Sequence, residues 1–540
     1  MLDSLARYFP PLPLPREMHF WDAQAISLGL PEEILMENAA HAALDVLKTY
    51  CPHLTGQNIL LLMGGGNNGG DAACLARLLL DAGARPQVLH TRPLSQYKGA
   101  SGKHVRIARS CGVPFQRHTA DLNKFQPDIL IDGLLGTGFH DVLRPDMLQL
   151  IRAVNALNVP LVLALDIPSG LHGISGRPMP EAIQATATVT FQAAKPGLLM
   201  PTATSWTGHI HIRDIGIPAR TRSEAPCSLY LADGHCLYPL TQCKPQAFKN
   251  LYGHVLVVGG VSGFGGAAHL AARAAIRSGT GLVTAAAPAS GLPDIKNGWA
   301  EIMTLALPSD LGNKWPKILP REFITRVQRC TSLVVGPGMG RGEDALIFLT
   351  ALLDLPHRPP TVFDADALML LAQSPSLLER ITVKDVLTPH PGEAAALLDC
   401  RASDVQLERL ETLQRLCARI PGVIVLKGAG TLVGQKQGPV LLCPYDIPQL
   451  SIAGAGDVLA GCLGGLLARC TMTEPVDATP YAFLRYAGQA VALHALAGKH
   501  LGTQWPLRGN TPSELADSLP VALAASALQL PTEDTLPWPR

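Results

Sequence analysis

The chain has 540 residues, of which 47% are hydrophobic and 16% are charged, and its formal net charge is +1. This length allows about three domains or two large ones, and the apolar content excludes a mainly disordered chain. The balanced charge gives no general attraction to nucleic acid or to an anionic membrane, so neither is predicted as a partner.

The cysteines and the N-terminal stretch indicate the cellular compartment of the protein. None of the twelve cysteines forms a C-x-x-C pair, which argues against a zinc cluster or a thioredoxin-like site and favours reduced thiols. The N-terminal stretch contains prolines and no unbroken apolar core, so it does not read as a signal peptide. The most membrane-like stretch, residues 452–468, contains Asp457 and is shorter than the ~20 residues of a membrane span. We therefore expect a cytoplasmic protein.

The first half begins with a strand, a glycine-rich turn and a helix. Residues 58–63 form an apolar run typical of a strand, the turn covers 64–71, and the helix is expected over 72–80. Further apolar runs, each after a plausible helix, lie at 129–131 and 161–165. Strands that alternate with helices predict a parallel sheet covered on both faces, which is a Rossmann-like three-layer α/β domain.

Three polar or glycine-rich turns follow these strands, at residues 64–71, 132–139 and 166–170. Ligands of parallel sheets bind at the carboxyl ends of the strands, so we expect the turns to meet at one site. The first turn could bring backbone N–H groups to a ligand, although an ordinary tight turn uses the same residues. Asp166 directly follows a buried strand, where a carboxylate needs a partner or ligand. Oxygens of Asn68, Asp132 and Ser169 could hold a hard monovalent cation.

The first half resembles the NAD(P)H-hydrate epimerase family, also called the YjeF N-terminal domain. The stretches that carry this resemblance are residues 35–39, the three turns, residues 191–197 and residues 214–218. The resemblance implies a potassium ion bound by Asn68, Asp132 and Ser169 and an acid–base role for Asp166. It also implies that the hydrated cofactor contacts Asn67, Asn68, Gly69, Gly70, Asp71, Gly136, Thr137, Gly138, Phe139, His140, Asp141, Val142 and Asp166. Ala72 departs from the family pattern, which often has glycine there.

The second half begins after a stretch without sustained periodicity. Residues 218–250 are rich in proline and polar residues and predict a linker, with a short strand at 228–231. A strand, a glycine loop and an Ala-rich helix are then expected at 254–259, 259–266 and 267–278. Later strands are expected at 333–335, 361–363 and 423–426. The final helix is predicted to start near Gly456, and a loosely held tail to start at residue 519.

Four loops of the second half carry groups that suit a phosphate-containing ligand. The turn at 454–457 opens a helix, so its N–H groups can bind an anion while Asp457 takes a proton from a hydroxyl group. An Asp at this position is also a common helix cap. His390 in the loop 390–393 would, alone, more often be structural. With the loops at 336–340 and 427–431, however, a ligand site is favoured.

These loops resemble the ribokinase-like superfamily and, within it, the ADP-dependent NAD(P)H-hydrate dehydratases, over residues 250–515. The resemblance implies that Ala267, Gly338, His390 and Asp457 contact the hydrated dinucleotide. Lys427, Gly428, Ala429, Gly430, Thr431 and Gly456 would bind the adenine nucleotide. Glu393 would organise magnesium and phosphate. Ala455 replaces the threonine of the family's glycine turn, which leaves the N–H groups in place.

The sequence thus predicts an α/β chain with two three-layer domains, Rossmann-like and then ribokinase-like. We expect an epimerase domain at 1–218, a linker at 219–250, a dehydratase domain at 251–518 and a tail at 519–540. The first would interconvert the R and S hydrates of NADH and NADPH (NADHX and NADPHX), with Asp166 as catalytic residue. The second would dehydrate the S form at the expense of ADP, with Asp457 as the base and with AMP and phosphate as the products. The epimerase domain would bind K⁺ and the dehydratase domain would bind Mg²⁺.

Two other readings remain open from the sequence. The second half could be a small-molecule kinase for a vitamin precursor beside a non-catalytic first half, although His390 argues against it. The first half could be a scaffold of the kind found in RNA-processing proteins, although the intact turn at 67–71, the intact Asp166 and the lack of a basic tract argue against that. A homo-oligomer is compatible with the sequence, and so is a preference for either NADH or NADPH.

Overall fold

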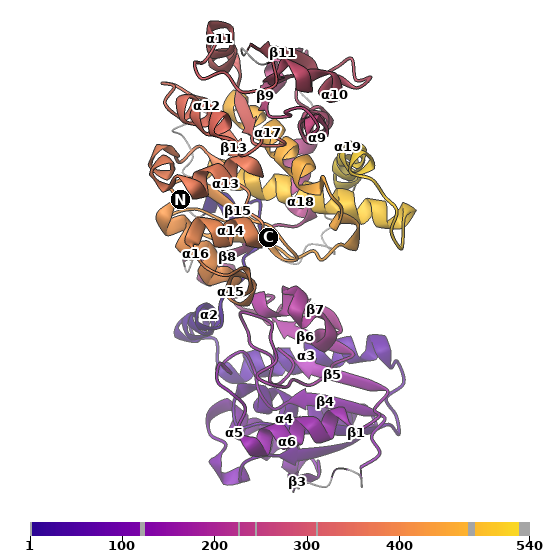
Figure 1. The fold of residues 1–540 in the computed structure, drawn as a ribbon. Coiled ribbons are helices and arrows are strands. Elements are labelled where there is room, and N and C mark those ends of the chain that lie inside the picture. Colours follow the sequence, from indigo (N-terminus) through magenta and orange to yellow (C-terminus); the bar gives the residue numbers. More distant parts are fainter. Residues whose placement is uncertain are drawn as a thin grey trace. The chain divides into compact units, whose positions relative to one another are not determined.

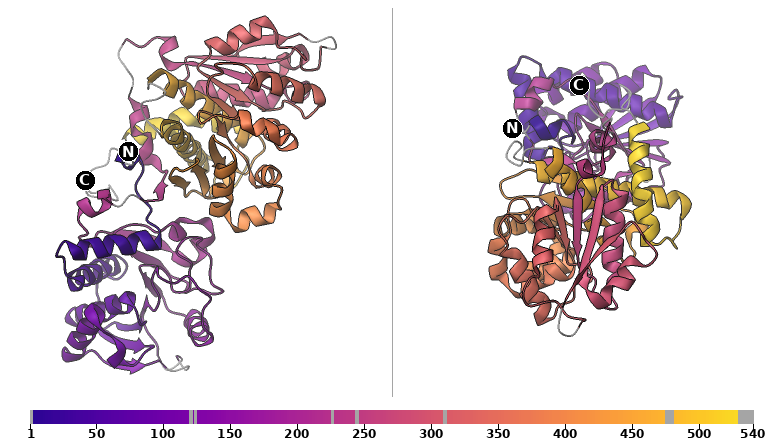
Figure 2. Two further views of the ribbon diagram at one scale, coloured as in Figure 1. Left: turned by 90° about the vertical axis from the view of Figure 1, so that its left-hand side faces the viewer. Right: turned by 90° about the horizontal axis from the view of Figure 1, so that it is seen from above.

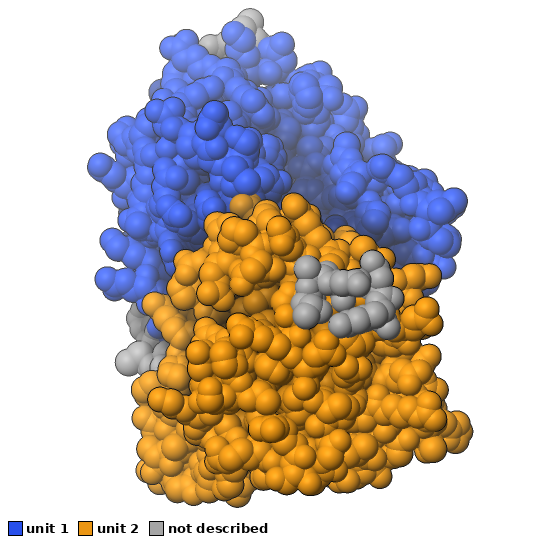
Figure 3. Space-filling view, turned by 90° about the horizontal axis from the view of Figure 1, so that it is seen from below, with its two compact units in different colours: residues 1–10, 230–535 blue, residues 11–229, 536–540 orange. Residues whose placement is uncertain are grey.

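The computed structural model describes residues 3–118, 122, 125–224, 227–242, 246–308, 312–473 and 481–528. The chain divides into two compact units, which Figure 3 shows in blue and orange. Unit 2 is Pro11–Leu229, and unit 1 consists of residues 3–10 together with the described residues from 230 to 528.

Unit 2 contains one parallel sheet of seven strands, in the order β3-β2-β1-β4-β5-β6-β7 (Figure 1). Its strands are β1 (Asn58–Met63), β2 (Arg85–His90), β3 (Phe115–Arg117), β4 (Ile129–Gly133), β5 (Leu161–Leu165), β6 (Ala187–Phe191) and β7 (His209–Arg213). Its main helices are α2 (Pro15–Ser27), α3 (Glu32–Tyr50), α4 (Asn67–Asp81), α5 (Gly99–Ser110) and α6 (Pro145–Asn155). The short helices α7 (Thr204–Thr207) and α8 (Ala219–Glu224) follow.

Helices cover both faces of this sheet. On one face, Leu150 and Ile151 of α6 pack against Leu60 and Leu130 of the two central strands. On the other face, α4 packs on β1 and β2 and lies between α3 and α5. Strands buried on both faces have continuous apolar sequences, which is why β1 and β5 could be recognised in the sequence.

The helix after β1 begins earlier than predicted. It starts at Asn67, so residues 67–71 form the first turns of α4 and not a loop. Gly69 permits this start because a Cβ at that position would lie 2.0 Å from the carbonyl oxygen of Gly64. The glycines that read as a turn in the sequence thus allow a helix to pack closely against the strand end.

Unit 1 contains a mixed sheet of ten strands, in the order β11-β10-β9-β12-β13-β14-β15-β16-β17-β8. The strands are β8 (Leu229–Leu231), β9 (His254–Val258), β10 (Leu282–Pro288), β11 (Met303–Leu307), β12 (Ser332–Val335), β13 (Thr361–Phe363), β14 (Val386–Leu387), β15 (Val423–Leu426), β16 (Thr431–Gly434) and β17 (Val440–Cys443). Pairing is parallel from β11 to β15, and antiparallel between β15, β16 and β17.

Helices lie on both sides of this sheet, as the right-hand view of Figure 2 shows. In chain order they are α1 (Asp3–Ala6), α9 (Gly265–Arg277), α10 (Leu292–Lys296), α11 (Arg321–Arg329), α12 (Glu343–Leu353), α13 (Asp366–Gln373), α14 (Pro391–Leu398), α15 (Ala402–Leu407), α16 (Arg409–Arg419), α17 (Ala455–Thr473), α18 (Ala482–Gln504) and α19 (Pro512–Leu528). The long helices α17 and α9 pack on each other and on β9. The two layered sheets confirm the predicted fold class.

The ends of unit 1 differ from the sequence prediction. The helix near Gly456 is not the final one, because α18 and α19 follow it. The predicted tail begins inside α19, where Leu519 is fully buried, and residues 529–540 lie outside the described residues. Much of the predicted linker is ordered, since β8 joins the sheet.

Residues 3–10 belong to unit 1, although the sequence prediction placed them in the first domain. Phe9 is fully buried, and its ring lies 3.1 Å from the position a Cβ on Gly488 of α18 would take. The guanidinium group of Arg485 lies 4.5 Å from the ring centre of Tyr8. Burial of this aromatic segment explains why it leaves the domain that follows it in sequence.

Candidate active sites

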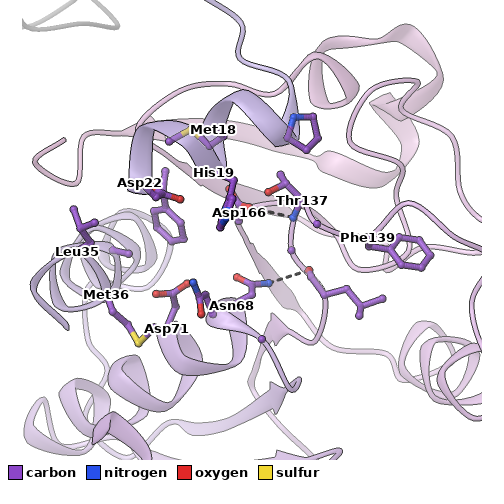
Figure 4. A pocket seen from close by; sticks show the side chains of 18 of the residues that line it. Met18, His19, Asp22, Leu35, Met36, Asn68, Asp71, Thr137, Phe139 and Asp166 are labelled. Carbon is purple, nitrogen blue, oxygen red and sulfur yellow. Dashed lines mark hydrogen bonds between the residues drawn. The ribbon is translucent and has the colours of Figure 1, made fainter. Parts of the chain in front are cut away.

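Unit 2 has a cavity of about 620 Å³ at the carboxyl ends of β1, β4 and β5, shown in Figure 4. Eight of the predicted contact residues line it: Asn67, Asn68, Asp71, Gly136, Thr137, Gly138, Phe139 and Asp166. The turns after three strands therefore meet at one site, as the parallel sheet requires. Helix α2 contributes Met18, His19 and Asp22 to the wall.

Other predicted contact residues lie elsewhere. Gly69 packs against Gly64, and Gly70 packs against Ser101 and Met36, so both are needed for close packing and neither lines the cavity. His140, Asp141 and Val142 are exposed and outside the cavity lining. The helix position of Gly69 and Gly70 explains the first difference, because only one face of α4 points to the cavity.

Asp166 is held at the edge of the cavity by a buried lysine. Its backbone φ is +62°, an unusual value for a residue with a side chain, and its N–H donates to the carbonyl oxygen of Val189 across 2.7 Å. The ammonium group of Lys195, itself only 1% exposed, donates to Asp166 Oδ1 across 2.5 Å. Lys195 also donates to Thr190 Oγ1 and to the carbonyl oxygen of Phe191, both at 2.9 Å.

Of the three further carboxyl groups that line the cavity with Asp166, those of Asp22 and Asp71 have raised pKa values. Burial raises the pKa of Asp22 to about 6, while the charge of Lys195 acts in the opposite direction. Burial, followed by the negative charges of Asp166 and Asp22, raises the pKa of Asp71 well above its usual value. Like charges that cannot all be ionised favour protonated carboxyl groups, so this cavity can both donate and accept protons.

A second polar cluster lies beside the cavity, under the turn after β4. Asp132 is fully buried and accepts hydrogen bonds from Ser169 N at 2.7 Å and Ser169 Oγ at 2.6 Å. Burial raises the pKa of Asp132 to about 6. The amide nitrogen of Asn68 donates to the carbonyl oxygens of Leu135 and Leu165, while Asn68 Oδ1 is buried without a hydrogen-bond partner. The side chains of Asn68, Asp132 and Ser169, whose oxygen atoms were predicted to bind a cation, thus belong to one cluster.

In unit 1, a partly buried lysine connects the predicted loops. Lys427 follows β15, and its ammonium group lies 2.7 Å from Asp364 Oδ1 and 3.7 Å from Glu393 Oε2. A Cβ on Gly456 would lie 3.4 Å from the same nitrogen. Burial opposes the charge of Lys427, but Asp364 and Glu393 outweigh it and raise the pKa of the lysine. Lys427 therefore lies between the strand-end acids and the glycine turn that opens α17.

His390 caps helix α14. Its Nδ1 accepts hydrogen bonds from Gly392 N at 3.0 Å and Glu393 N at 3.2 Å, while Glu393 Oε2 accepts from His390 N at 2.8 Å. Because Nδ1 is the acceptor, Nε2 carries the proton of the neutral ring. Burial, followed by the charge of Lys427, lowers the pKa of His390. The half-exposed ring can thus donate a hydrogen bond to a ligand from Nε2.

The surroundings of Asp457 shift its pKa toward neutrality. Burial, followed by the negative charge of Asp364, raises its pKa to about 7. The same causes act on Glu393, whose pKa burial raises to about 7 against the charge of Lys427. A carboxyl group with a pKa near neutrality accepts a proton in one step and releases it in the next.

Among the remaining predicted residues, Gly338 and Ala267 are connected through the loop before α9. Gly338, with φ of +60°, has its carbonyl oxygen 2.9 Å from Val261 N, in the loop that leads to α9 and Ala267. Gly340 N donates to Asp366 Oδ2 at 2.8 Å. Arg409 was not predicted, yet its guanidinium group donates to the carbonyl oxygens of Leu426, Lys427 and Gly430. It fixes the loop 427–431.

Asp22, Lys195, Asp364 and Arg409 were missed at the sequence level. Lys195 had a usable signal, since it lies shortly after β6 and a lysine needs a charged partner when it is buried. Asp364 likewise follows β13 directly. Asp22 and Arg409 lie on helices remote in sequence from the turns, and no local pattern points to them.

No helix among the described residues combines the length and the apolar composition needed to cross a bilayer. Both units place charged side chains and glycine turns at the ends of parallel strands, which defines the class of two-domain α/β enzymes with a separate site in each domain. Residues 32–197 match the family described as YjeF-related protein N-terminus, and residues 255–521 match NAD(P)H-hydrate dehydratase.

The chain is 33% identical to the bifunctional NAD(P)H-hydrate repair enzyme of Coxiella burnetii, over 94% of this chain and 98% of the relative. It is 34% identical to that of Moorella thermoacetica, over 92% of this chain and 93% of the relative. A crystal structure of an ADP/ATP-dependent NAD(P)H-hydrate dehydratase from Bacillus subtilis matches with 22% identity and a TM-score of 0.43, covering 55% of this chain and 98% of that one. The chain belongs to the family of bifunctional NAD(P)H-hydrate repair enzymes.

Proposed function

We propose that unit 2 interconverts the R and S hydrates of NADH and NADPH and that unit 1 dehydrates the S hydrate with ADP as phosphoryl donor. Family membership over nearly the whole chain supports both activities. The observation that carries the proposal is the pairing of a lysine with an acidic cluster at each site, the buried Lys195 with Asp166 and the partly buried Lys427 with Asp364.

In unit 2, Asp166 is the acid–base residue at the hydroxyl-bearing carbon of the hydrate. Lys195 positions the carboxyl group of Asp166, whose Oδ2 accepts a hydrogen bond from Thr137 N at 3.4 Å. Asp71, whose pKa is raised well above its usual value, supplies a protonated group in the same cavity, and Asp22, whose pKa is raised to about 6, can take up a proton close to neutral pH. The cavity of about 620 Å³ is large enough for the nicotinamide end of a dinucleotide.

The cluster of Asn68, Asp132 and Ser169 fits a potassium ion. Asn68 Oδ1 is a buried acceptor with no donor, and the carboxyl group of Asp132 has no basic side chain among its hydrogen-bond partners. All three side chains offer oxygen atoms, which suit a hard monovalent cation. When bound, potassium supplies positive charge that compensates Asp132 and fixes the turns that form the cavity wall.

In unit 1, Asp457 takes the proton of the hydrate's hydroxyl group as that oxygen attacks the terminal phosphorus of ADP, and AMP leaves. The phosphate then departs with the C–O electron pair while a proton is lost from the neighbouring carbon, which restores the ring double bond. N–H groups of the turn at 454–456 and the Lys427 ammonium group stabilise the phosphoryl oxygens. His390 donates from Nε2 to the hydrated dinucleotide, which also contacts Ala267 and Gly338.

The adenine nucleotide would bind at Lys427, Gly428, Ala429, Gly430, Thr431 and Gly456. Glu393, held by His390 N and close to Lys427, is the residue placed to organise magnesium with the phosphates. Bound magnesium supplies charge neutralisation on the transferred phosphate. The carboxyl group of Glu393, whose pKa burial raises to about 7, is ionised more readily when that positive charge is present.

The test is a repair assay with separated R and S hydrates of NADH, with ADP and ATP compared in parallel and the recovered absorbance of NADH as the readout. Wild-type protein should restore both hydrates. Asp457→Asn should restore neither while still interconverting them, as chromatography of the hydrates shows. Asp166→Asn should restore only the S hydrate. If NADH is not recovered and a phosphorylated vitamin precursor forms instead, unit 1 is a kinase and the proposal fails.

A further inference from the structure

A cluster of potential metal ligands lies on the helical layer of unit 2 among the helices α3, α4 and α5, and its members do not line the cavity. Glu37 comes from α3, Cys74 from α4 and His104 from α5, and one ligand atom of each lies within 4.8 Å of the others. Cys74 Sγ donates to Glu37 Oε2 across 3.1 Å, and His104 Nδ1 lies 3.7 Å from the same oxygen. The three residues are far apart in sequence, so no spacing motif revealed them.

His104 has the tautomer and orientation of a metal ligand. Its Nε2 is 3.3 Å from the carbonyl oxygen of Glu33, which can only accept, so Nε2 carries the proton. The lone pair is therefore on Nδ1. This atom is buried and has no hydrogen-bond partner, in a residue that is only 4% exposed. A ligating histidine typically donates its other ring N–H to a backbone carbonyl in this way. The lone pair on this nitrogen lies beside a carboxylate and a thiol and is unsatisfied as the side chains stand.

We propose that Glu37, Cys74 and His104 bind a divalent zinc ion. Thiolate and imidazole ligands together with one carboxylate suit zinc better than calcium or magnesium, which prefer oxygen alone. Tetrahedral zinc sites place ligand atoms about 3.3–3.8 Å apart, so small side-chain movements suffice from the present separations. His41, one turn after Glu37, has Nε2 3.4 Å from Glu37 Oε1 and is available as fourth ligand.

The neighbouring cation must also be accommodated. One terminal nitrogen of Arg77 donates to Glu37 Oε1 and, across 3.8 Å, to Cys74 Sγ, and the other lies 3.8 Å from Asp81 Oδ2. When zinc takes the Glu37 carboxylate, Arg77 keeps Asp81 as its counter-ion. The thiol of Cys74 loses its proton to solvent on binding, since only the thiolate is a ligand, so the two anionic ligands neutralise the ion. Glu37 and His41 are partly exposed and give the ion a path from solvent.

The full-length protein would be titrated with cobalt(II), a spectroscopic substitute for zinc, followed by competition with zinc. Wild-type protein should show one equivalent of a thiolate-to-cobalt charge-transfer band that zinc abolishes, with release of one proton per ion. Cys74→Ser and His104→Gln should each weaken binding at least tenfold. The matched controls are Cys111→Ser and His53→Gln, which change an exposed cysteine and an exposed histidine outside the cluster.

Circular dichroism distinguishes loss of the site from loss of the fold, and zinc should raise the melting temperature of wild type but not of a folded Cys74→Ser protein. If either substitution unfolds the chain, the wild-type titration with its controls still decides. The proposal is overturned if wild-type protein shows no such band, if the band persists in folded Cys74→Ser or His104→Gln protein, or if Cys111→Ser removes it. It does not depend on the repair activities, which are measured separately.

Discussion

Lys195 and Asp166 form an ion pair of 2.5 Å at the cavity of unit 2, with the lysine buried and the carboxylate partly open to a ligand. Lys195→Met keeps the length of the side chain and removes its charge, so Asp166 loses its positioning partner. We expect epimerisation to fall by about 100-fold or more, in the range of a lost acid–base group. The measurement is the rate of R-to-S conversion by chromatography.

Dehydration of the S hydrate by the same Lys195→Met protein is the internal control and should be unchanged. A second control is Lys103→Met, which removes a half-exposed lysine paired with Glu33 on the surface. It should leave epimerisation within twofold, because surface ion pairs contribute little. Equal losses in both lysine variants would contradict the role of Lys195.

The dehydratase should depend on pH through Asp457. Burial and the charge of Asp364 raise its pKa to about 7, and a general base works only when deprotonated. We therefore expect kcat/KM for dehydration to increase as pH rises toward about 7 and to level off above it. Asp366 also raises this pKa, so Asp366→Asn should move the midpoint to lower pH. A profile that is flat across this range, or a midpoint that moves upward in the variant, would be incompatible with the assignment.

Potassium should stabilise unit 2 through Asp132. Replacing potassium by sodium or choline at equal ionic strength should lower the melting temperature of wild-type protein, because ligand binding to the native state stabilises it. Asp132→Asn is isosteric and removes the buried charge, so it should abolish the difference between the salts. Calorimetry of both proteins provides the measurement. A potassium response that survives in Asp132→Asn would mean that the ion binds elsewhere.

Phe9 should stabilise unit 1 in spite of its place at the start of the chain. It is fully buried, so Phe9→Ala should cost about 3–5 kcal/mol in the free energy of unfolding of that unit. Phe20→Ala is the matched control, since this side chain is 48% exposed and should cost less than about 1 kcal/mol. Urea unfolding followed by the loss of dehydratase activity reports on unit 1. Similar midpoints for the two variants would show that the N-terminal segment is only loosely held.

The strands were the most predictable part of the fold. The bounds of β1, β5, β13 and β15 agree with the apolar runs in the sequence, because strands buried on both faces are apolar throughout. The predicted start of α4 was wrong because Asn and Gly favour turns locally, whereas the packing of Gly69 against Gly64 favours a helix. The role of residues 3–10 depends on contacts with α18, which no local pattern encodes.

The candidate sites were predictable where a residue directly follows a strand. Asp166 and Lys427 follow this rule directly, Asp132 lies near the end of β4, and His390 lies shortly after β14. The exposed residues 140–142 show its limit, because a turn that starts at a strand end need not stay at the cavity. Asp22 and the cluster of Glu37, Cys74 and His104 depend on helix packing, which determines which side chains meet across the layer.

The chain passes between the units twice at neighbouring points, since Leu12 N donates to Leu229 O and Leu231 N donates to Pro10 O. Residues 3–10 therefore leave the ribosome long before α18, against which they pack. Unit 2 can fold during synthesis while this first segment waits for nearly the whole remaining chain. A gene divided at the apparent border between the halves would separate Phe9 from its binding place, and the dehydratase fragment would expose apolar surface there. Because translation proceeds from the N-terminal side, residues 3–10 can take their place only after α18 has been made.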